Sequence, residues 1–248
     1  MSDYLNYFRK SLREYYEMLG LDNIDSRIEQ RVSRERSKKI VKNLDKYIRK
    51  DNLKILDVGC GWGEMQLEFQ EWNKTGELFG IEPDDELYDI SSKINPKIKH
   101  AFAEQIPFET GEFDLIIFND VIEHVNSHYE SLKEILRVTN KKEGYIYISF
   151  PNYRYPAEGH YKVSMLPYSC ILPKWIYKLN LKINGRNPLF FDKYVNPICD
   201  YQFFRLLNEI TKESNIKYEF ISLSSDTKTL KERIFGYANI KGIIKLNS

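Results

Sequence analysis

The stretch "ILDVGCGWGE" at residues 55–64 decides the fold of this chain. The apolar run 53–58 predicts a buried strand, and it ends in a loop with glycine at every second position. Glycines this close together cost backbone entropy, so the loop needs a shape that side chains forbid. Because residues 64–72 resume helical spacing, the loop should present backbone N–H groups to a ligand at a helix N-terminus, where negative charge is favoured.

The same alternation continues outward from this loop. Strands are expected at 53–58, 77–82, 97–102, 112–120 and 144–150, with helices between them at 64–72, 84–94 and 121–139. A helix at 198–214 and two late strands at 217–223 and 241–247 complete the pattern. Strands and helices that alternate at this pitch form βαβ units, which predicts an α/β fold with a parallel sheet covered on both faces.

Two segments lie outside this alternation. Residues 4–19 and 26–50 are rich in helix-forming residues and predict an N-terminal helical cap. Residues 151–197 hold six of the nine prolines, many aromatic residues and little periodicity. A stretch of this kind within a compact domain is usually functional, so it predicts a lid or insertion after the fifth strand.

Composition excludes several classes of protein. With 37 basic and 36 acidic residues, the net charge of +1 argues against nucleic acid as the main partner. The basic run at 27–39 is interleaved with acids and is interpreted as a solvated helix face. No apolar signal segment and no membrane span are evident. The three cysteines are far apart, so neither a disulfide framework nor a zinc site is expected, and the chain should be soluble, reduced and cytoplasmic.

The spacing of the glycines separates two classes of ligand. A dinucleotide fingerprint would place its third glycine at position 64, where this chain has Glu64, and that carboxylate would repel a pyrophosphate. The loop resembles instead the first motif of class I S-adenosylmethionine-dependent methyltransferases, D-x-G-x-G-x-G. Asp57, Gly59, Gly61 and Gly63 match every position of that motif.

Three later segments carry the same resemblance. Glu82 ends the second strand in "GIEPDDE", where the family places an acid on the ribose hydroxyls. "AFAEQIPFETGEFDLII" at 101–117 is similar to the stretch over the adenine, although Phe102 stands where many relatives have aspartate. "FNDVIEHV" at 118–125 looks like the segment that faces the methionine end. The resemblance implies a cofactor site formed by Asp57, Gly59, Cys60, Gly61, Trp62, Gly63, Glu82, Pro83, Ala103, Glu104 and Asn119. The Trp62 ring is expected either to form a surface on which the cofactor lies or to pack between the loop and the helix.

The resemblance also implies an organisation for the whole chain. It predicts a Rossmann-like, seven-stranded, mostly parallel sheet in a single methyltransferase domain over 1–248. Within that domain we expect a helical cap (1–50), a cofactor-binding half (51–150), an acceptor-pocket insertion (151–197) and a C-terminal helix with strands (198–248). The expected cofactor is S-adenosylmethionine, released as S-adenosylhomocysteine, and no metal is expected.

Histidine is the expected base, because methyl transfer to a hydroxyl requires removal of a proton near neutral pH. His100 lies in a strand pattern and is expected to be structural. His124, His128 and His160 are the candidates, with His124 or His160 favoured. His124 and His128 share i, i+4 spacing, which could also suggest a metal pair, but few further ligands lie nearby in the sequence.

The segment "PNYRYPAEGHYKVSMLP" at 151–167 predicts the acceptor pocket, with Tyr153, Arg154, Tyr161 and Lys162 as substrate-binding residues. Aromatic faces beside polar groups suit a sugar, and the basic side chains suit a phosphate on it. "EGHY" is similar to a stretch of methyltransferases of bacterial surface-glycan assembly.

These features favour O-methylation of a sugar, a surface-glycan precursor or a phosphorylated small molecule by a monomer or homodimer. N-methylation of a small amine or protein side chain, and a non-catalytic cofactor-binding module, stay open as alternatives. A nucleic-acid methyltransferase is disfavoured, because "NDVI" stands where an N/D-P-P-Y motif would be expected.

Overall fold

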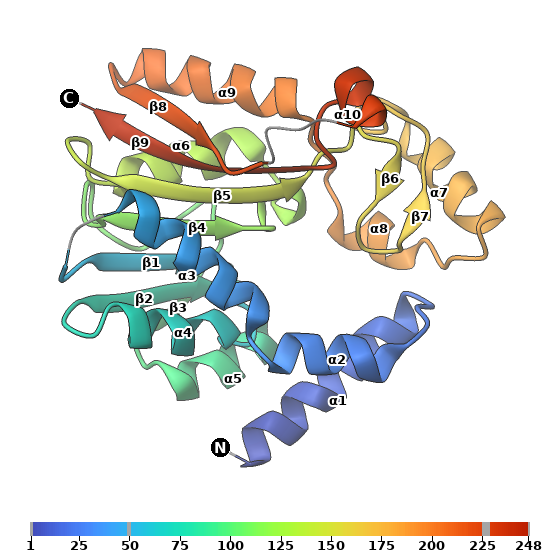
Figure 1. Cartoon of the computed structure of the whole chain (residues 1–248), viewed down its shortest axis with the longest axis horizontal. Helices are drawn as coiled ribbons and strands as arrows, with labels where there is room; N and C mark the ends of the chain where they lie inside the picture. The colour runs from blue at the N-terminus through green and yellow to red at the C-terminus, as the bar shows by residue number, and fades with distance from the viewer. Residues whose placement is uncertain (1, 49–50, 225–228, 248) are drawn as a thin grey trace.

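A seven-stranded sheet forms the centre of the computed structural model, which describes residues 2–48, 51–224 and 229–247 (Figure 1). The strand order is β3-β2-β1-β4-β5-β9-β8; β1 to β5 run parallel, and β9 is antiparallel to both of its neighbours. The strands are β1 (Lys54–Val58), β2 (Glu77–Glu82), β3 (Ile98–His100), β4 (Leu115–Asn119), β5 (Tyr145–Pro151), β8 (Lys217–Ser222) and β9 (Asn239–Asn247). The predicted seven-stranded, mostly parallel Rossmann-like sheet is confirmed.

Helices cover both faces of this sheet (Figure 1). Because side chains alternate across a strand, Leu56 and Val58 face one core while Ile55 faces the other. The first core is closed by α6 (His128–Val138) and α9 (Asp200–Glu213), and the second by α3 (Glu35–Tyr47) and α4 (Glu64–Trp72). Helix α5 (Asp85–Ile94) contacts β2 and β3, and Asp84 caps it as predicted by accepting from two backbone N–H groups.

Two predicted helices are wrong in their boundaries. The helix expected over 26–50 is interrupted at Arg34, whose left-handed φ of 56° separates α2 (Ile24–Val32) from α3; residues 49–50 lie outside the described residues. The helix expected over 121–139 begins only at His128, because Ser127 caps its N-terminus there. A short 3₁₀ turn, η1 (Ile122–His124), precedes it.

The insertion after β5 contains more regular structure than its sequence predicted. It holds a small hairpin, β6 (Ala157–Glu158) and β7 (Val163–Ser164), followed by α7 (Lys174–Ile183) and α8 (Leu189–Tyr194). Its core is separate from the two sheet cores and includes Leu19 and Leu21, which follow α1 (Ser2–Met18). The insertion and the N-terminal cap therefore pack against each other. A last helix, α10 (Leu230–Phe235), precedes β9.

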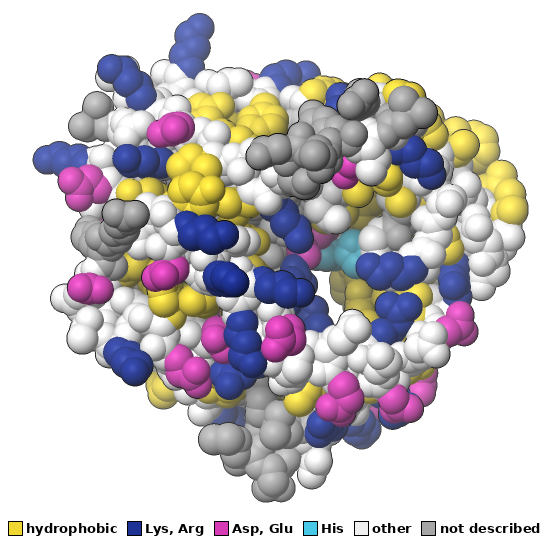
Figure 2. Space-filling model, viewed as in Figure 1, with side chains coloured by type: hydrophobic (Ala, Val, Ile, Leu, Met, Phe, Trp, Pro, Cys, Tyr) yellow, Lys and Arg dark blue, Asp and Glu magenta, His cyan; other side chains and the backbone are white. Residues whose placement is uncertain are grey.

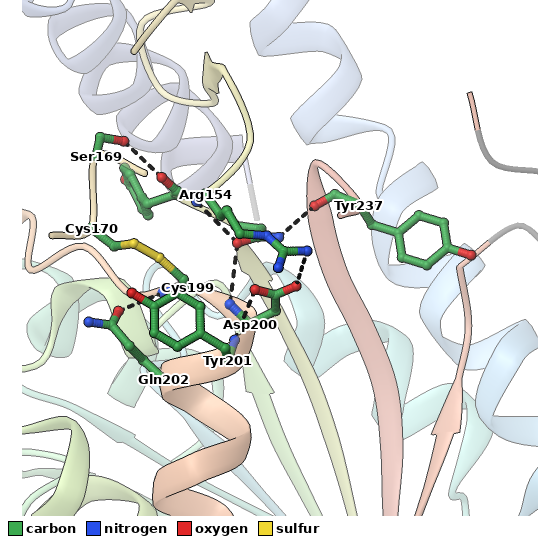
Figure 3. The surroundings of a disulfide bond; sticks show 10 residues. Arg154, Ser169, Cys170, Cys199, Asp200, Tyr201, Gln202 and Tyr237 are labelled. Atoms are coloured by element: carbon green, nitrogen blue, oxygen red, sulfur yellow. Dashed lines mark hydrogen bonds and ion pairs between the residues drawn. A yellow bond between two sulfur atoms is a disulfide. The ribbon is translucent and has the colours of Figure 1, made fainter. Parts of the chain in front are cut away.

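The expectation of three unbridged cysteines is wrong. Cys170 of the insertion and Cys199 at the start of α9 form a disulfide, with their Cα atoms 5.9 Å apart (Figure 3). Cys60 is free and buried. The bonded pair is 29 residues apart in sequence, and only the fold of the insertion brings the two side chains together. Among the described residues, no helix has the length and apolar character needed to cross a bilayer.

Candidate active site

A cavity of about 820 Å³ opens beside the C-terminal ends of β1, β2 and β4. Its walls come from α1, the glycine loop after β1, the segment after β4 and helix α8 of the insertion. Figure 2 shows the hollow, with histidine, acidic and basic side chains meeting at it. Ligands of open α/β sheets bind at this position, where parallel strands end and helices begin.

The glycine loop has the bare backbone that its sequence predicted. Gly59 adopts a φ of +68°, and a Cβ there would lie only 2.7 Å from the Val121 side chain. A Cβ on Gly61 would meet no atom within 4 Å, so the backbone at Gly61 faces open space. Gly63 does not line the cavity but caps the N-terminus of α4 in a left-handed conformation. The loop thus exposes peptide groups rather than side chains to a ligand.

Glu82 holds the loop in this shape. One carboxylate oxygen accepts the N–H of Gly61 at 2.7 Å, and the other accepts the N–H of Asp84 at 3.0 Å. Burial raises the pKa of Glu82 more than these two backbone hydrogen bonds lower it. Glu82 lines the cavity, and each carboxylate oxygen has a second lone pair with which to accept a ligand hydroxyl.

Asp57 lies under the loop in a buried polar network that the sequence did not reveal. Gln66 donates to the Asp57 carboxylate at 3.0 Å and accepts from Asn95 at 2.9 Å. Burial raises the pKa of Asp57 to about 7, the Gln66 hydrogen bond opposes this, and the Glu82 charge adds to it. Gln66 and Asn95 carry no motif signal, because their roles depend on contacts between distant helices.

The other predicted cofactor residues also line the cavity, namely Cys60, Trp62, Pro83, Ala103, Glu104 and Asn119. Trp62 packs edge-on against Phe8 of α1, with ring centroids 5.4 Å apart, so it joins the cap to the loop as well as facing the cavity. Glu104 accepts the N–H groups of Asn126 and Ser127 at 2.6 and 3.1 Å. Its carboxylate therefore fixes the segment that precedes α6.

His124 and His160 meet in the cavity, with ring centroids 5.2 Å apart. His124 Nδ1 lies 2.8 Å from the Tyr194 carbonyl oxygen. A carbonyl only accepts, so the neutral ring carries its proton on Nδ1 and keeps the Nε2 lone pair. The fold thus orients one ring of this pair for proton transfer.

The other two histidines lie away from this pair. His128 Nε2 is 3.1 Å from the Asn196 carbonyl oxygen, and burial lowers its pKa. His124 and His128 do not share one helix, since His124 is in the 3₁₀ turn and His128 begins α6, so the i, i+4 spacing does not place them one helical turn apart. His100 accordingly has a structural contact, with Nε2 2.8 Å from the Pro83 carbonyl oxygen.

A different cluster of metal-ligand atoms does form. Across the described residues, Glu123, His124 and His160 place one such atom each within 4.8 Å of one another. The Glu123 side chain is buried, and its carboxylate lies 3.9 Å from His124 Nε2. A carboxylate and two imidazoles are suitable ligands for a divalent transition metal. The same groups can equally serve a proton transfer, since a carboxylate beside an imidazole stabilises its charged form.

Arginines of the cap also reach the cavity, so the interpretation of residues 27–39 as a solvated face is wrong for these. Arg31 pairs with Glu64 at 3.0 Å, and Arg36 pairs with Asp120 at the end of β4. Desolvation would raise the pKa of Asp120, but the Arg36 charge and the hydrogen bond from Ser149 outweigh it and lower the pKa. Sequence spacing could not show this, because α3 lies far from β4 in the chain.

The four predicted substrate-binding residues are not among the cavity-lining residues. Tyr153 and Tyr161 are buried in the core of the insertion. Arg154 pairs with Asp200 at 2.9 Å, beside the disulfide (Figure 3), and Lys162 is exposed. The side of the cavity formed by α1 and the insertion is lined instead by Tyr15, Tyr16, His160, Phe190, Lys193 and Tyr194. The tyrosines of "PNYRYPAEGHYK" thus stabilise the wall that carries His160.

Comparison with known proteins agrees with this geometry. The methyltransferase domain family matches residues 29–182, which include α3 of the cap, the glycine loop, the histidine pair and much of the insertion. The chain belongs to the methyltransferase domain family. The resemblance that rested on the glycine loop and Glu82 is therefore confirmed at the level of the family.

Curated methyltransferases are similar to part of this chain. An uncharacterized methyltransferase of Schizosaccharomyces pombe is 32% identical over 114 residues, covering 41% of this chain and 40% of that protein. Demethylmenaquinone methyltransferase of Staphylococcus aureus is 32% identical over 124 residues, covering 48% and 49%. The chain thus spans less than half the length of these curated relatives.

A solved structure matches almost the whole methyltransferase domain in shape. The plantazolicin methyltransferase BamL, solved with S-adenosylhomocysteine and a desmethyl-plantazolicin analogue, has a TM-score of 0.59 and 14% identity, covering 98% of each chain. At this identity the match concerns the fold alone.

Proposed function

We propose that this methyltransferase transfers the methyl group of S-adenosylmethionine to a hydroxyl oxygen of a small acceptor. The acceptor class is a sugar, a surface-glycan precursor or a phosphorylated small molecule. The observation that carries the proposal is the His124–His160 pair, which lies in the same cavity as the glycine loop, Asp57 and Glu82. A proton acceptor is needed at that place for a hydroxyl and is much less important for an amine.

The residues present fit the methyl donor. Glu82 offers carboxylate lone pairs to two adjacent hydroxyls, as on a ribose. The open backbone at Gly61 leaves room for close approach, and the half-exposed Phe102 ring offers an apolar face to a purine. Arg31 and Arg36, which pair with Glu64 and Asp120, line the cavity and have further N–H groups that could donate to a carboxylate. When bound, the donor supplies an electrophilic methyl group on a sulfonium.

His124 is the favoured base in this proposal. Its Nδ1–H donates to the Tyr194 carbonyl, which fixes the ring, and Nε2 is the atom that would accept the hydroxyl proton. Glu123, 3.9 Å from that nitrogen, stabilises the resulting imidazolium. A positioned base contributes about 10²–10⁴-fold to the rate, and holding acceptor and donor in line contributes about 7–11 kcal/mol.

The walls around the histidines support a hydroxylated acceptor. Tyr15, Phe190 and Tyr194 offer aromatic faces and hydroxyl groups, and Lys193 offers a charge for a phosphate. We place the reaction in surface-polysaccharide biosynthesis, in the cytoplasm, with the chain acting as monomer or homodimer. Thiol trapping in cells tests the compartment, because recovery of the Cys170–Cys199 pair in bonded form would favour an oxidising one.

The test is a turnover assay with S-adenosylmethionine across pools of nucleotide-linked sugars and phosphorylated metabolites. With the acceptor found, H124A or H160A should lower kcat by about 10²–10⁴-fold, whereas H100A, whose ring contacts the Pro83 carbonyl and not the histidine pair, should leave kcat at saturating S-adenosylmethionine unchanged. Nearly full turnover in both cavity variants would favour N-methylation. Absence of S-adenosylmethionine binding by calorimetry would exclude the enzyme altogether.

Treatment with a chelator distinguishes proton transfer by His124 from metal binding by the Glu123, His124 and His160 cluster. With His124 as base, turnover should be unchanged after treatment with EDTA. A loss that zinc or manganese restores would instead assign Glu123, His124 and His160 to a metal.

A further inference from the structure

Helix α7 presents an apolar stripe to the surface. Trp175, Leu179 and Ile183 recur at i, i+4 and i+8 and are 64%, 50% and 75% exposed. Ile171 and Leu189, which flank the helix, are 60% and 65% exposed. Hydrophobic side chains line the edge of the molecule that α7 occupies (Figures 1 and 2). A contiguous exposed patch of this kind marks an interaction site more often than scattered single residues do.

The opposite side of α7 is firmly packed. Tyr177 and Leu181 are buried in the core of the insertion, and the Tyr177 ring stacks on Phe191 of α8 with centroids 3.5 Å apart. Helix α7 therefore already has a buried face, and the outward stripe is not needed to stabilise the fold. Its exposure has to be explained by something outside this chain.

The charge around the stripe is one-sided. Residues 159–191 contain no aspartate or glutamate and five basic residues, which leaves 32 basic against all 36 acidic residues for the rest of the chain. Lys174, Lys178 and Lys182 run along α7 beside the stripe, also at i, i+4 spacing. Lys178 pairs with Asp192 at 3.1 Å. The segment thus combines apolar side chains with a net positive charge in a nearly neutral protein.

We propose that α7 docks this protein on the surface of an anionic lipid bilayer. Amphipathic helices with tryptophan and aliphatic residues on one side and lysines beside them lie in the headgroup region. Long lysine side chains can cover apolar surface while their ammonium groups contact lipid phosphates. A second copy of this chain fits less well, because it would bring the same lysines face to face. This inference does not depend on the identity of the methyl acceptor.

Docking in this manner would orient the side of the cavity formed by α1 and the insertion. Helix α8, on which α7 stacks, contributes Phe190, Lys193 and Tyr194 to the cavity. The bound protein would therefore hold this wall next to the bilayer, with the sheet farther from it. No spanning segment is required, because the helix lies along the surface.

Vesicle co-sedimentation of the full chain tests the proposal. We expect binding to vesicles of phosphatidylcholine mixed with phosphatidylglycerol and little binding to phosphatidylcholine alone. Replacing Lys174 and Lys182 with glutamine should weaken binding roughly 25-fold, at about one factor of five per lysine. The matched control replaces Lys42 and Lys46, two exposed lysines of α3, which removes the same charge from another surface and should leave binding unchanged.

The apolar contribution is tested separately. W175S should weaken vesicle binding at least tenfold, whereas Y47S, at an exposed aromatic residue of α3, should not. Calorimetry with S-adenosylmethionine on each variant shows that the fold and donor site are intact. Equal binding to neutral vesicles, or equal losses in the α3 controls, would overturn the proposal. So would dimerisation in analytical ultracentrifugation that W175S abolishes, since a second copy would then cover the stripe.

Discussion

Replacing Glu82 with glutamine tests whether this carboxylate both shapes the glycine loop and binds the donor. Its oxygens accept the N–H groups of Gly61 and Asp84 at 2.7 and 3.0 Å. In E82Q one oxygen becomes an NH₂ group, so a donor faces a donor at one of these positions. Hydrogen bonds to charged groups contribute about 1.5–3 kcal/mol. The affinity for S-adenosylmethionine should therefore fall about ten- to hundredfold.

The assay is isothermal titration of wild type and variants with S-adenosylmethionine and S-adenosylhomocysteine. Glu77→Gln is the matched control: the same substitution at the other end of β2, on an exposed side chain that pairs with Lys97 at 2.6 Å. Because burial raises the pKa of Glu82, a neutral amide there also removes a desolvation cost. Thermal unfolding of E82Q should consequently stay close to that of wild type, which separates binding from stability.

Two results would refute this reasoning. The first is binding of S-adenosylmethionine by E82Q within about twofold of wild type, the range expected for loss of a surface ion pair. The second is an equal loss of affinity in E77Q, which would mean that charge anywhere on the strand matters rather than the two backbone hydrogen bonds.

Asp57→Asn should flatten the pH dependence of stability in the ligand-free protein. Burial raises the pKa of Asp57 from 3.8 to about 7, so the free energy of unfolding of wild type falls by up to ~4 kcal/mol as pH rises through that window. Melting temperatures that change with pH equally in wild type and variant would contradict this. Gly59→Ala should lower the free energy of unfolding in urea more than Gly111→Ala does. Both residues have φ near +70°, but only at Gly59 would a Cβ approach a neighbour, at 2.7 Å. Equal losses of about 1–3 kcal/mol would leave the positive φ as the sole cause. Cys170→Ser should lower the free energy of unfolding by about 3.5 kcal/mol for a 29-residue separation from Cys199. Wild type treated with a reductant should then have the same melting temperature as C170S. A higher melting temperature for the reduced wild type would contradict the assignment of the disulfide.

The cofactor half could be predicted from the sequence because its signals are local. A buried strand, three alternating glycines and a helix within residues 53–72 specify both the turn and the edge of the sheet where it lies. Glu82 could be placed because the next parallel strand ends at the same edge. The backbone hydrogen bonds that Gly59, Cys60 and Gly61 donate all go to Ile81 and Glu82 at the end of β2.

The side of the cavity formed by the cap and the insertion could not be predicted, because its contacts join segments that are distant in sequence. Arg36 reaches Asp120 from another helix, and Tyr153 turns into a core that only the folded insertion creates. The Cys170–Cys199 bond depends on that same core. Periodicity also missed the helical turn at His124, since apolar residues at 121, 122 and 125 suit a continuous helix equally well.

The contact of Phe8 with Trp62 has a kinetic consequence. Helix α1 is attached to the glycine loop at this aromatic pair and to the insertion at Tyr15 and Phe190, whose ring centroids are 5.4 Å apart. Between these two contacts, Ser11, Leu12 and Glu14 of α1 line the cavity. We expect one of these ring contacts to separate when spent donor is exchanged for fresh donor, so that the residence time of the product is set separately from the chemical step.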